Sequence, residues 1–446
     1  MKFPETYQVP YVYDVASTPA RSKATIRVTV PGSKSITNRA LLLAVLADGT
    51  SMLRGALFSD DSRHFLSCVK ALGFDAESDE ETAMIRVTGI GGPTPKKEAS
   101  LYVGSAGTAA RFLTAYLGVS RGTFFLDASE QMRKRPMAPL LRSIESLGCE
   151  VISEEAPDCF PFTLRSNGFQ KSDVTVNVDQ SSQFLSALLI ASCLCENDFF
   201  TLAVGSHGMA YVDMTRKMME QFGVEAEVLE ETKTQRRFKT RAGQHYTPLD
   251  YQIEPDVSGA AYFYALCPLL GVPVQVWGVH LASLQGDVEF LRILERLGCT
   301  LSDLPEGILL TPPEDGAYPG ITADMHACSD QAITLAAIAP FAKGPTTITG
   351  IGHIRFQESD RIAAIQTELT KMGIRCEMTD DSVTIWPGDP KPCTVNTYDD
   401  HRMAMGFTLI GLRSKGIVID NPGCCKKTFE NYYEVLEKVL CNFQSL

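Results

Sequence analysis

The stretch FLRILERLG, residues 290–298, is one of five similar segments in this chain of 446 residues. The other four are FLSCVKALG at 65–73, LLRSIESLG at 140–148, TRKMMEQFG at 215–223 and IQTELTKMG at 365–373. Each has the apolar spacing of an amphipathic helix, and the final glycines stand 75 residues apart. Because a glycine in the left-handed conformation often ends a helix, the segments predict one unit repeated along the chain. The closing stretch YYEVLEKVL at 432–440 is a sixth such helix.

A second set of helices runs in phase with the first. Each has a polar opening turn followed by a run of small and apolar residues, which predicts a helix buried on all sides. The six begin at Lys34, Ser105, Ser181, Ser258, Ser329 and Asp399.

Short β-branched or alternating runs between the helices predict strands. They include ATIRVTV at 24–30, TFFLDA at 123–128, DVTVNV at 173–178, VPVQVWGV at 272–279 and TTITGI at 346–351. The fold class is therefore mixed α/β. Because a single core stops growing at about 250–300 residues, six units predict two domains of three units each. The strand at 24–30 lies far enough ahead of the first helix to belong to either domain.

The composition is that of an ordinary globular chain, with 44% hydrophobic and 21% charged residues. It has no apolar run of 18 residues, and MKFPETYQVP at 1–10 lacks the pattern of a signal peptide, so we expect a cytoplasmic protein with no membrane partner. The net charge of −12 argues against a sequence-independent nucleic-acid binder.

Cysteine and histidine do not show the spacing of a metal site. The thirteen cysteines include no C-x-x-C, and the seven histidines include no H-x-x-x-H. Reduced, structural thiols are the expected state, with metal binding by Cys424 and Cys425, or by Cys193 and Cys195, as the alternative.

The polar opening turns of the apolar helices carry basic residues. PGSKSITNRALLLA at 31–44 places Lys34 at a helix start and Arg39 about a turn further on, while Arg111 and Arg402 occupy later openings. It is not a Walker A loop, because Ser33 precedes the lysine where that motif has glycine. Helix N-termini and guanidinium groups together favour phosphate or carboxylate. A capped helix with solvated charges is the alternative interpretation of each opening taken alone.

Titratable groups gather in the second half of the chain. Asp330 stands at a helix start, where it can cap the helix, and Glu358 and Arg361 stand one turn apart, as in a helical ion pair. His401, Arg402 and Lys427 follow. Because these helices are otherwise apolar, so many charged openings indicate a ligand site.

Eight motifs in this order and spacing resemble the 5-enolpyruvylshikimate-3-phosphate synthase family across nearly the whole chain. They are PGSKSITNRALLLA, GSAGTAARFLTA, MRKRPM, SSQFLSALL, SDQAITLAA, RFQESDR, YDDHRMAM and CKKTF. The resemblance implies a two-domain inside-out α/β barrel built from six β-α-β-α-β-β repeats, three per domain. It also implies that residues 32–254 carry most of the phosphoshikimate site. Residues 1–31 and 255–446 would carry the acid–base residues and part of the phosphoenolpyruvate site.

The implied reaction transfers an enolpyruvyl group from phosphoenolpyruvate to the 5-hydroxyl of 3-phosphoshikimate and releases phosphate through a tetrahedral ketal. Both substrates are small polyanions, and no metal or organic cofactor takes part. The resemblance further implies a protein that closes over its substrates, and we expect a monomer.

The matching positions imply a role for each site residue. Asp330 would accept the hydroxyl proton and Glu358 would protonate the methylene, with Lys34 and His401 as further proton carriers. Contacts to 3-phosphoshikimate would come from Lys34, Ser35, Arg39, Ser181, Ser182, Gln183, Tyr211, Asp330, His353 and Gln357. Contacts to phosphoenolpyruvate would come from Lys34, Gly107, Arg135, Gln183, Arg361, Arg402 and Lys427. Gly107 is also similar to the glyphosate-sensitive form of the family.

Several positions depart from the usual family pattern. Gln357 replaces a lysine, Ser105 an asparagine and Gly208 a serine, while His353 stands where many members have asparagine and others histidine. An enolpyruvyl transferase for another acceptor, or a non-catalytic anion-binding relative, is therefore the alternative. The related enzyme that acts on UDP-N-acetylglucosamine uses a cysteine in its second unit, and here no cysteine lies between Cys68 and Cys149.

Overall fold

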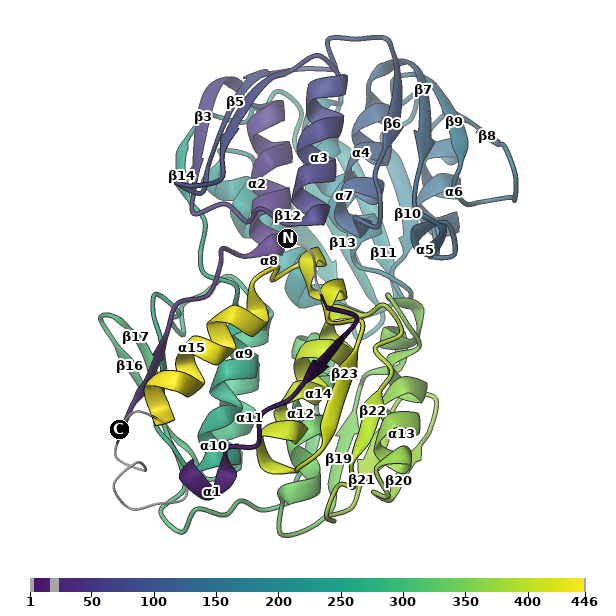
Figure 1. Cartoon of the computed structure of the whole chain (residues 1–446). Coiled ribbons are helices and arrows are strands. Elements are labelled where there is room, and N and C mark those ends of the chain that lie inside the picture. The colour runs from purple at the N-terminus through teal and green to yellow at the C-terminus, as the bar shows by residue number, and fades with distance from the viewer. Residues whose placement is uncertain (1–3, 17–23, 445–446) are drawn as a thin grey trace. The chain divides into compact units, whose positions relative to one another are not determined.

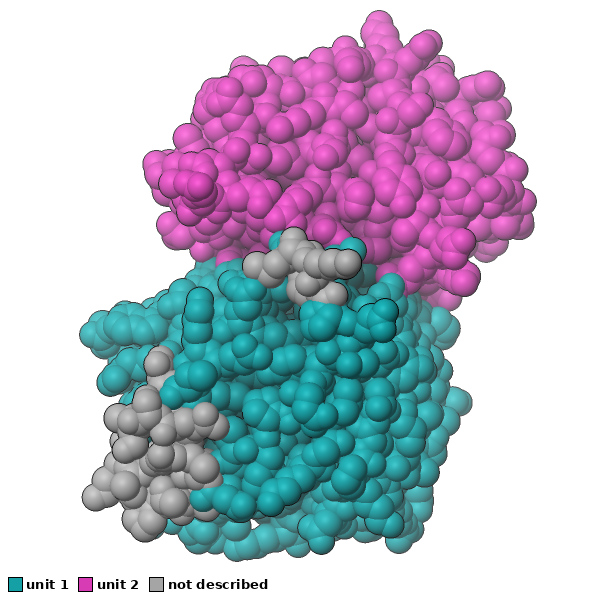
Figure 2. All heavy atoms as spheres, viewed as in Figure 1, with its two compact units in different colours: residues 1–31, 254–446 teal, residues 32–253 magenta. Residues whose placement is uncertain are grey.

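The chain forms two compact units, which are coloured separately in Figure 2. The computed structural model describes residues 4–16 and 24–444; the first three residues of the stretch 1–10 lie outside this part. Unit 2 is the continuous segment Gly32–Ile253, whereas unit 1 combines Met1–Pro31 with Glu254–Leu446.

The repeats form small sheets, each of which contains one parallel pair of strands (Figure 1). In the second repeat the sheet order is β6-β7-β9-β8, with β6 parallel to β7 and the other neighbours antiparallel. A parallel pair needs a long crossover, and an apolar helix supplies it. The second, third and fifth repeats thus contain the whole β-α-β-α-β-β unit that the resemblance implies, whereas the first, fourth and sixth each take one strand from elsewhere in the chain.

Unit 2 contains the first three repeats. The first has α2 (Lys34–Leu46), β3 (Asp48–Arg54), α3 (Asp60–Ala71), β4 (Asp75–Asp79) and β5 (Met84–Ile90). The second has β6 (Glu98–Tyr102), α4 (Gly107–Val119), β7 (Arg121–Asp127), α5 (Glu130–Arg133), α6 (Ala138–Ser146), β8 (Glu150–Ser153) and β9 (Phe162–Asn167). The third has β10 (Asp173–Asn177), α7 (Gln183–Ala191), η1 (Ser192–Leu194), β11 (Phe199–Val204), α8 (Met209–Gln221), β12 (Ala226–Glu231), β13 (Gln235–Thr240) and, after it, β14 (Asp250–Gln252).

Unit 1 contains the other three repeats and the N-terminal segment. That segment has β1 (Thr6–Gln8), α1 (Tyr13–Ala16) and β2 (Ile26–Val28). The fourth repeat has α9 (Val257–Tyr264), α10 (Leu266–Leu270), β15 (Val274–Val276), η2 (Gly286–Val288), α11 (Glu289–Arg296), β16 (Thr300–Leu304) and β17 (Gly307–Thr311). The fifth has β18 (Thr322–Asp324), η3 (His326–Gln331), α12 (Ala332–Ile338), η4 (Ala339–Phe341), β19 (Thr346–Thr349), η5 (Gly352–Phe356), α13 (Arg361–Lys371), β20 (Cys376–Met378) and β21 (Val383–Ile385). The sixth has β22 (Cys393–Val395), α14 (His401–Arg413), β23 (Ile417–Asp420), η6 (Pro422–Lys427) and α15 (Tyr432–Gln444).

Three sheets are completed by strands from distant parts of the chain. β14 pairs in parallel with β3, so the last strand of unit 2 completes the sheet of the first repeat. β2 pairs in parallel with β15, and β1 pairs with β23 in a three-stranded sheet. The strand at 24–30 therefore belongs to unit 1.

The apolar helices form the core of each unit. Every residue of α4 is buried, as is α14 from His401 to Leu412. The amphipathic helices α3, α6, α8, α11 and α13 bury only one face. Each of these five is followed by its repeat glycine with φ between +79° and +101°, which confirms the predicted helix ends.

Candidate functional site

Arg361, the first residue of α13, is the centre of a charged cluster in unit 1. Its side chain is 1% exposed and contacts three carboxylates. Its Nε donates to Asp400 Oδ2 at 2.8 Å, its Nη2 to Glu358 Oε2 at 2.8 Å, and its Nη1 to Asp330 Oδ1 at 3.1 Å. Burial alone would lower the pKa of Arg361, but these three carboxylates raise it above its usual value.

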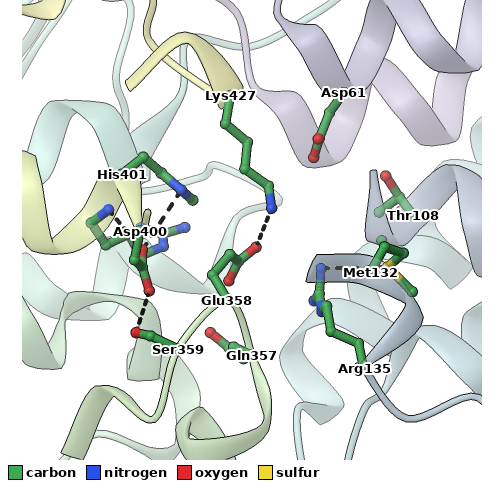
Figure 3. A network of polar contacts seen from close by, with 12 residues as sticks. Asp61, Thr108, Met132, Arg135, Gln357, Glu358, Ser359, Asp400, His401 and Lys427 are labelled. Carbon is green, nitrogen blue, oxygen red and sulfur yellow. Dashed lines mark hydrogen bonds and ion pairs between the residues drawn. The ribbon is translucent and has the colours of Figure 1, made fainter. Parts of the chain in front are cut away.

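Two further cations balance the cluster. Arg402 Nη2 donates to Asp330 Oδ2 at 2.6 Å, and Lys427 Nζ lies 3.1 Å from Glu358 Oε1, a pair seen in Figure 3. Within this cluster three carboxylates therefore face three cations. Buried charges persist only when they are paired, so the balance accounts for a polar cluster at the ends of apolar helices.

Helix caps place these residues. Asp400 caps α14 by accepting from Arg402 N at 2.9 Å, and Asp360 caps α13 by accepting from Ala363 N at 3.0 Å. Asp400 also accepts from Ser359 Oγ at 3.0 Å. The same aspartate therefore ends the turn before α14 and holds Arg361 at the start of α13.

One expectation for this cluster is corrected, and a second holds with a difference of placement. Asp330 lies in η3, ahead of α12, and its carboxylate accepts from guanidinium groups instead of capping the helix. Glu358 precedes α13, so its pair with Arg361 is not one between two residues of a helix. For Asp330 tertiary contacts replace the local cap, whereas Glu358 and Arg361 do form the expected ion pair, from positions on either side of the start of α13.

Two histidines line the cluster. His353 is buried, and its Nε2 lies 2.7 Å from Ser329 Oγ. Burial lowers the pKa of His353 to about 3, so the ring is neutral at pH 7 and acts through hydrogen bonds. His401 is also buried, with Nδ1 3.7 Å from Asp400 Oδ1.

Asp287 is a buried carboxylate beside this cluster. It is 3% exposed and accepts from Ser258 Oγ at 2.7 Å and from Gln331 Nε2 at 3.3 Å. Burial, with the nearby charge of Asp330, raises the pKa of Asp287 to about 6. No sequence motif pointed to this residue, because its environment combines side chains of the fourth and fifth repeats.

Replacing Asp287 by asparagine should stabilise the protein at neutral pH. A carboxyl whose pKa is raised in the folded state binds its proton more readily there, so its contribution to stability falls as the pH rises from about 4 to about 6. Asparagine removes the buried charge, and we expect a gain of about 1–3 kcal/mol at pH 7.5 that shrinks below pH 6. Thermal unfolding at pH 4.5, 6 and 7.5 measures this, and an equal gain at all three would contradict it.

The opening turn of α2 holds the first cation of unit 2. Ser33 caps the helix through Ile36 N, and Lys34 Nζ lies 3.5 Å from Asp61 Oδ2. Asp61 is 2% exposed, in the first turn of α3, and is labelled in Figure 3. Lys34 is thus held by a buried carboxylate that the motif did not identify.

Arg39 is buried among neutral oxygen acceptors. It donates to Thr215 Oγ1 at 2.7 Å and to the carbonyl oxygens of Ser35 at 2.9 Å and Tyr211 at 3.3 Å. Its guanidinium lies over Phe112, 5.3 Å from the ring centroid. Burial lowers the pKa of Arg39 to about 10, so it remains a cation at neutral pH.

Two guanidinium groups lie at Gly107, the first residue of α4. A Cβ at this position would stand 2.7 Å from Arg111 Nη1 and 2.8 Å from Arg135 Nη1. Arg111 also donates to Pro136 O at 2.8 Å and reaches Gln183 Oε1 at 3.5 Å. Two guanidinium groups thus lie at the first turn of a helix, a combination that suits a phosphate or carboxylate ligand.

Gly107→Ala should weaken anion binding with little change in stability. The new methyl group would displace Arg111 and Arg135, which are flexible at their ends, so the fold can accommodate it. Loss of one charge-assisted hydrogen bond corresponds to about a tenfold or larger loss of affinity. Calorimetric titration with phosphoenolpyruvate measures this affinity. Gly118→Ala is the packing control, because Gly118 also lies in α4 and its new methyl group would meet the ring of Phe169. Unchanged affinity for phosphoenolpyruvate would contradict it.

The serine cluster at α7 accounts for one departure from the family pattern. Ser181 Oγ accepts from Gln183 N at 3.2 Å, and Ser182 is buried. Gly208 has φ +64°, and a Cβ there would lie 2.6 Å from Ser182 Oγ. In this backbone a serine at 208 would clash with Ser182, so glycine is needed.

Gln357 contacts a side chain of the cluster, whereas the resemblance implies that it contacts 3-phosphoshikimate. Its Oε1 accepts a hydrogen bond from Arg361 Nη1. Ser105 lies in the segment before α4.

The structure groups the expected residues by unit. Unit 1 brings together Asp330, His353, Gln357, Glu358, Arg361, His401, Arg402 and Lys427. Unit 2 contains Lys34, Ser35, Arg39, Gly107, Arg135, Ser181, Ser182, Gln183 and Tyr211. The motifs missed the roles of Asp61 and Asp287, and YDDHRMAM contained Asp400 without showing its contact to Arg361.

Metal clusters and membrane-spanning helices are absent from the part of the chain that the structure describes. Residues 4–16 and 24–444 contain no group of His, Cys, Asp and Glu that could hold a metal ion, and the thirteen cysteines are free thiols. Within the same ranges no helix combines the length and apolar character that a membrane span requires.

Comparisons with known proteins agree on one family. The profile described as EPSP synthase (3-phosphoshikimate 1-carboxyvinyltransferase) matches residues 19–436. The chain is 41% identical over 407 residues to the 3-phosphoshikimate 1-carboxyvinyltransferase of Nostoc punctiforme, covering 91% of this chain and 94% of that one.

Solved structures share the fold. EPSP synthase from Acinetobacter baumannii superposes with a TM-score of 0.76 at 22% identity, covering 97% of this chain and 98% of that one. The enolpyruvyl transferase NikO from Streptomyces tendae gives 0.69 at 16% identity, covering 94% and 95%.

Proposed function

Because the chain belongs to the EPSP synthase family, we propose that it transfers the enolpyruvyl group of phosphoenolpyruvate to the 5-hydroxyl of 3-phosphoshikimate and releases phosphate. The reaction is a step of chorismate and aromatic amino-acid biosynthesis. The observation that supports it most is the cluster in which Arg361 and Arg402 bind Asp330 while Lys427 contacts Glu358. It combines an acid, a base and cations for two polyanions.

The reaction has two steps. In the first, the hydroxyl oxygen adds to C2 of phosphoenolpyruvate and C3 takes a proton, which gives a tetrahedral ketal. In the second, the bond to the phosphate oxygen breaks and the new methyl group loses a proton. Asp330 accepts the hydroxyl proton and Glu358 donates to C3, with Lys34 and His401 as further proton carriers.

The cations bind phosphoenolpyruvate. Arg361 and Arg402 are suited to its planar carboxylate, because guanidinium can donate two parallel hydrogen bonds. Lys427 and Arg135 bind its phosphate, with Lys34, Gly107 and Gln183. An anion that engages Lys427 weakens the pair between Lys427 and Glu358 and adds negative charge beside it. Both effects favour the protonated form of Glu358, which a general acid requires.

The acceptor binds mainly to unit 2. Ser35, Arg39, Ser181, Ser182, Gln183 and Tyr211 hold the ring and phosphate of 3-phosphoshikimate, and Asp330, His353 and Gln357 contribute from unit 1. Since each unit carries only part of this set, we expect neither unit to be active when produced alone. The enzyme acts as a cytoplasmic monomer with no metal or organic cofactor.

Phosphate release from phosphoenolpyruvate tests this function. Purified protein is assayed with 3-phosphoshikimate, shikimate or UDP-N-acetylglucosamine, with and without EDTA. We expect release with 3-phosphoshikimate alone, unchanged by EDTA. Release with another acceptor would favour a transferase for that acceptor, which is the second candidate because Gln357 stands in place of a lysine. No release with any acceptor would favour a non-catalytic, anion-binding relative.

A further inference from the structure

A strained turn precedes α14. Tyr398 and Asp399 have φ of +54° and +53°, so two successive residues that are not glycine adopt the left-handed conformation. Such residues persist only where the surroundings hold them, and they gather at functional sites. The next three residues are Asp400, His401 and Arg402, which all belong to the cluster around Arg361.

Glu368, on α13, contacts this turn. It is 1% exposed; its Oε1 accepts from Tyr398 Oη at 2.8 Å, and its Oε2 accepts from Asn396 N at 3.1 Å. Partial burial and the hydrogen bond to Glu368 raise the pKa of Tyr398 to about 12, so the hydroxyl keeps its proton and donates. Lys371 Nζ binds the same carboxylate at 2.6 Å from a side chain that is 42% exposed.

The position of Glu368 in the repeat is unusual. In the four other helices that end in a repeat glycine, the matching positions are Cys68, Ser143, Met218 and Ile293, all buried. The side chain at this position is buried in all five helices, and only the fifth of these repeats has a carboxylate there. A buried carboxylate is costly unless a partner needs it, which points to the contact with the turn.

Helix α13 therefore holds the segment before α14 at two places. Arg361, at its first residue, binds Asp400, and Glu368, two turns later, binds Tyr398 and Asn396. Asn396 Oδ1 also accepts from Tyr398 N at 3.0 Å. Together these contacts hold the start of α14 in a fixed position relative to α13. They thereby also hold Arg402, the second residue of α14, where its guanidinium contacts Asp330.

We propose that Glu368 and Tyr398 are positioning residues that hold the 396–400 turn in its strained form and thereby place Arg402 for the reaction. This rests on the proposed function, because Arg402 is assigned to phosphoenolpyruvate there. Glu368 touches no substrate in this proposal and acts through the turn. A role in packing alone would change stability without changing the kinetic constants of the folded enzyme.

Kinetics of the full-length protein test the positioning role. Tyr398→Phe removes one hydroxyl and Glu368→Gln removes the charge and one acceptor, while Lys371→Ala removes only the half-exposed partner. Because small displacements of a binding group are costly, we expect Tyr398→Phe and Glu368→Gln to lower kcat/KM for phosphoenolpyruvate roughly 10- to 100-fold. Lys371→Ala should stay within about twofold of wild type. Wild-type kinetic constants in Tyr398→Phe, or an equal loss in Lys371→Ala, would overturn the proposal.

Hydrogen exchange provides a second readout that needs no substrate. We expect peptides covering 396–403 to exchange faster in Tyr398→Phe than in wild type, with no change over 361–371. Unchanged exchange at 396–403 would overturn the proposal even if no acceptor supports phosphate release. Failure of the wild-type enzyme to release phosphate would count against the proposed function alone.

Discussion

Replacing Arg361 by methionine is expected to lower the free energy of unfolding by about 3–5 kcal/mol and to abolish measurable turnover. The substitution keeps much of the side-chain volume but leaves Asp330, Glu358 and Asp400 without their common cation. Urea unfolding measures the loss.

Arg355→Met is the matched control for this prediction. Arg355 also pairs with an aspartate at the start of α13, but its partner Asp360 is 43% exposed. Arg355 is 18% exposed and also donates to the carbonyl oxygens of Thr379 and Asp380. We therefore expect a measurable loss that stays smaller than in Arg361→Met, because no buried carboxylate loses its cation. Adding Asp400→Asn to Arg361→Met should restore part of the stability and none of the activity. A loss below 1 kcal/mol in Arg361→Met would show that the cluster tolerates an unpaired charge.

Glu358→Gln is expected to lower kcat by about 100-fold or more while the protein stays folded. Glutamine keeps an oxygen for Arg361 and Lys427 but cannot donate a proton as a carboxylic acid does. Deuterium incorporation into C3 of phosphoenolpyruvate in D₂O reports the proton transfer directly and should fall in parallel.

Glu377→Gln is the control for Glu358→Gln. It removes an exposed carboxylate that pairs with Arg375 in the same unit, and it should leave kcat unchanged. Near-normal exchange at C3 in Glu358→Gln would remove this residue from the proton transfer.

The fold was largely predictable from the sequence. The 75-residue period of Gly73, Gly148 and their equivalents predicted the helix ends, and the apolar runs predicted the buried helices, because both patterns are local. The pairing of β14 with β3 and of β2 with β15 was not predictable in this way. Those pairs join strands that lie about two hundred residues or more apart, and no periodicity encodes them.

The site was predictable in part. Motif resemblance named Lys34 and Arg361, because those residues stand in recognisable local patterns. The carboxylates that hold them, Asp61 and Asp400, lie outside the motif of the cation that each one contacts, so the local pattern gave them no role. The cap expected of Asp330 failed for the same reason, since two guanidinium groups from later segments bind its carboxylate.

The insertion of unit 2 within unit 1 has a consequence for folding. Residues 32–253 form a continuous segment, so unit 2 can fold while the rest of the chain is still being synthesised. β1 and β2 are made first, but their partners β23 and β15 come after that whole segment. Contacts so distant in sequence form slowly. Unit 1 should therefore complete its sheets last, because β1 can pair only after residues 417–420 have left the ribosome.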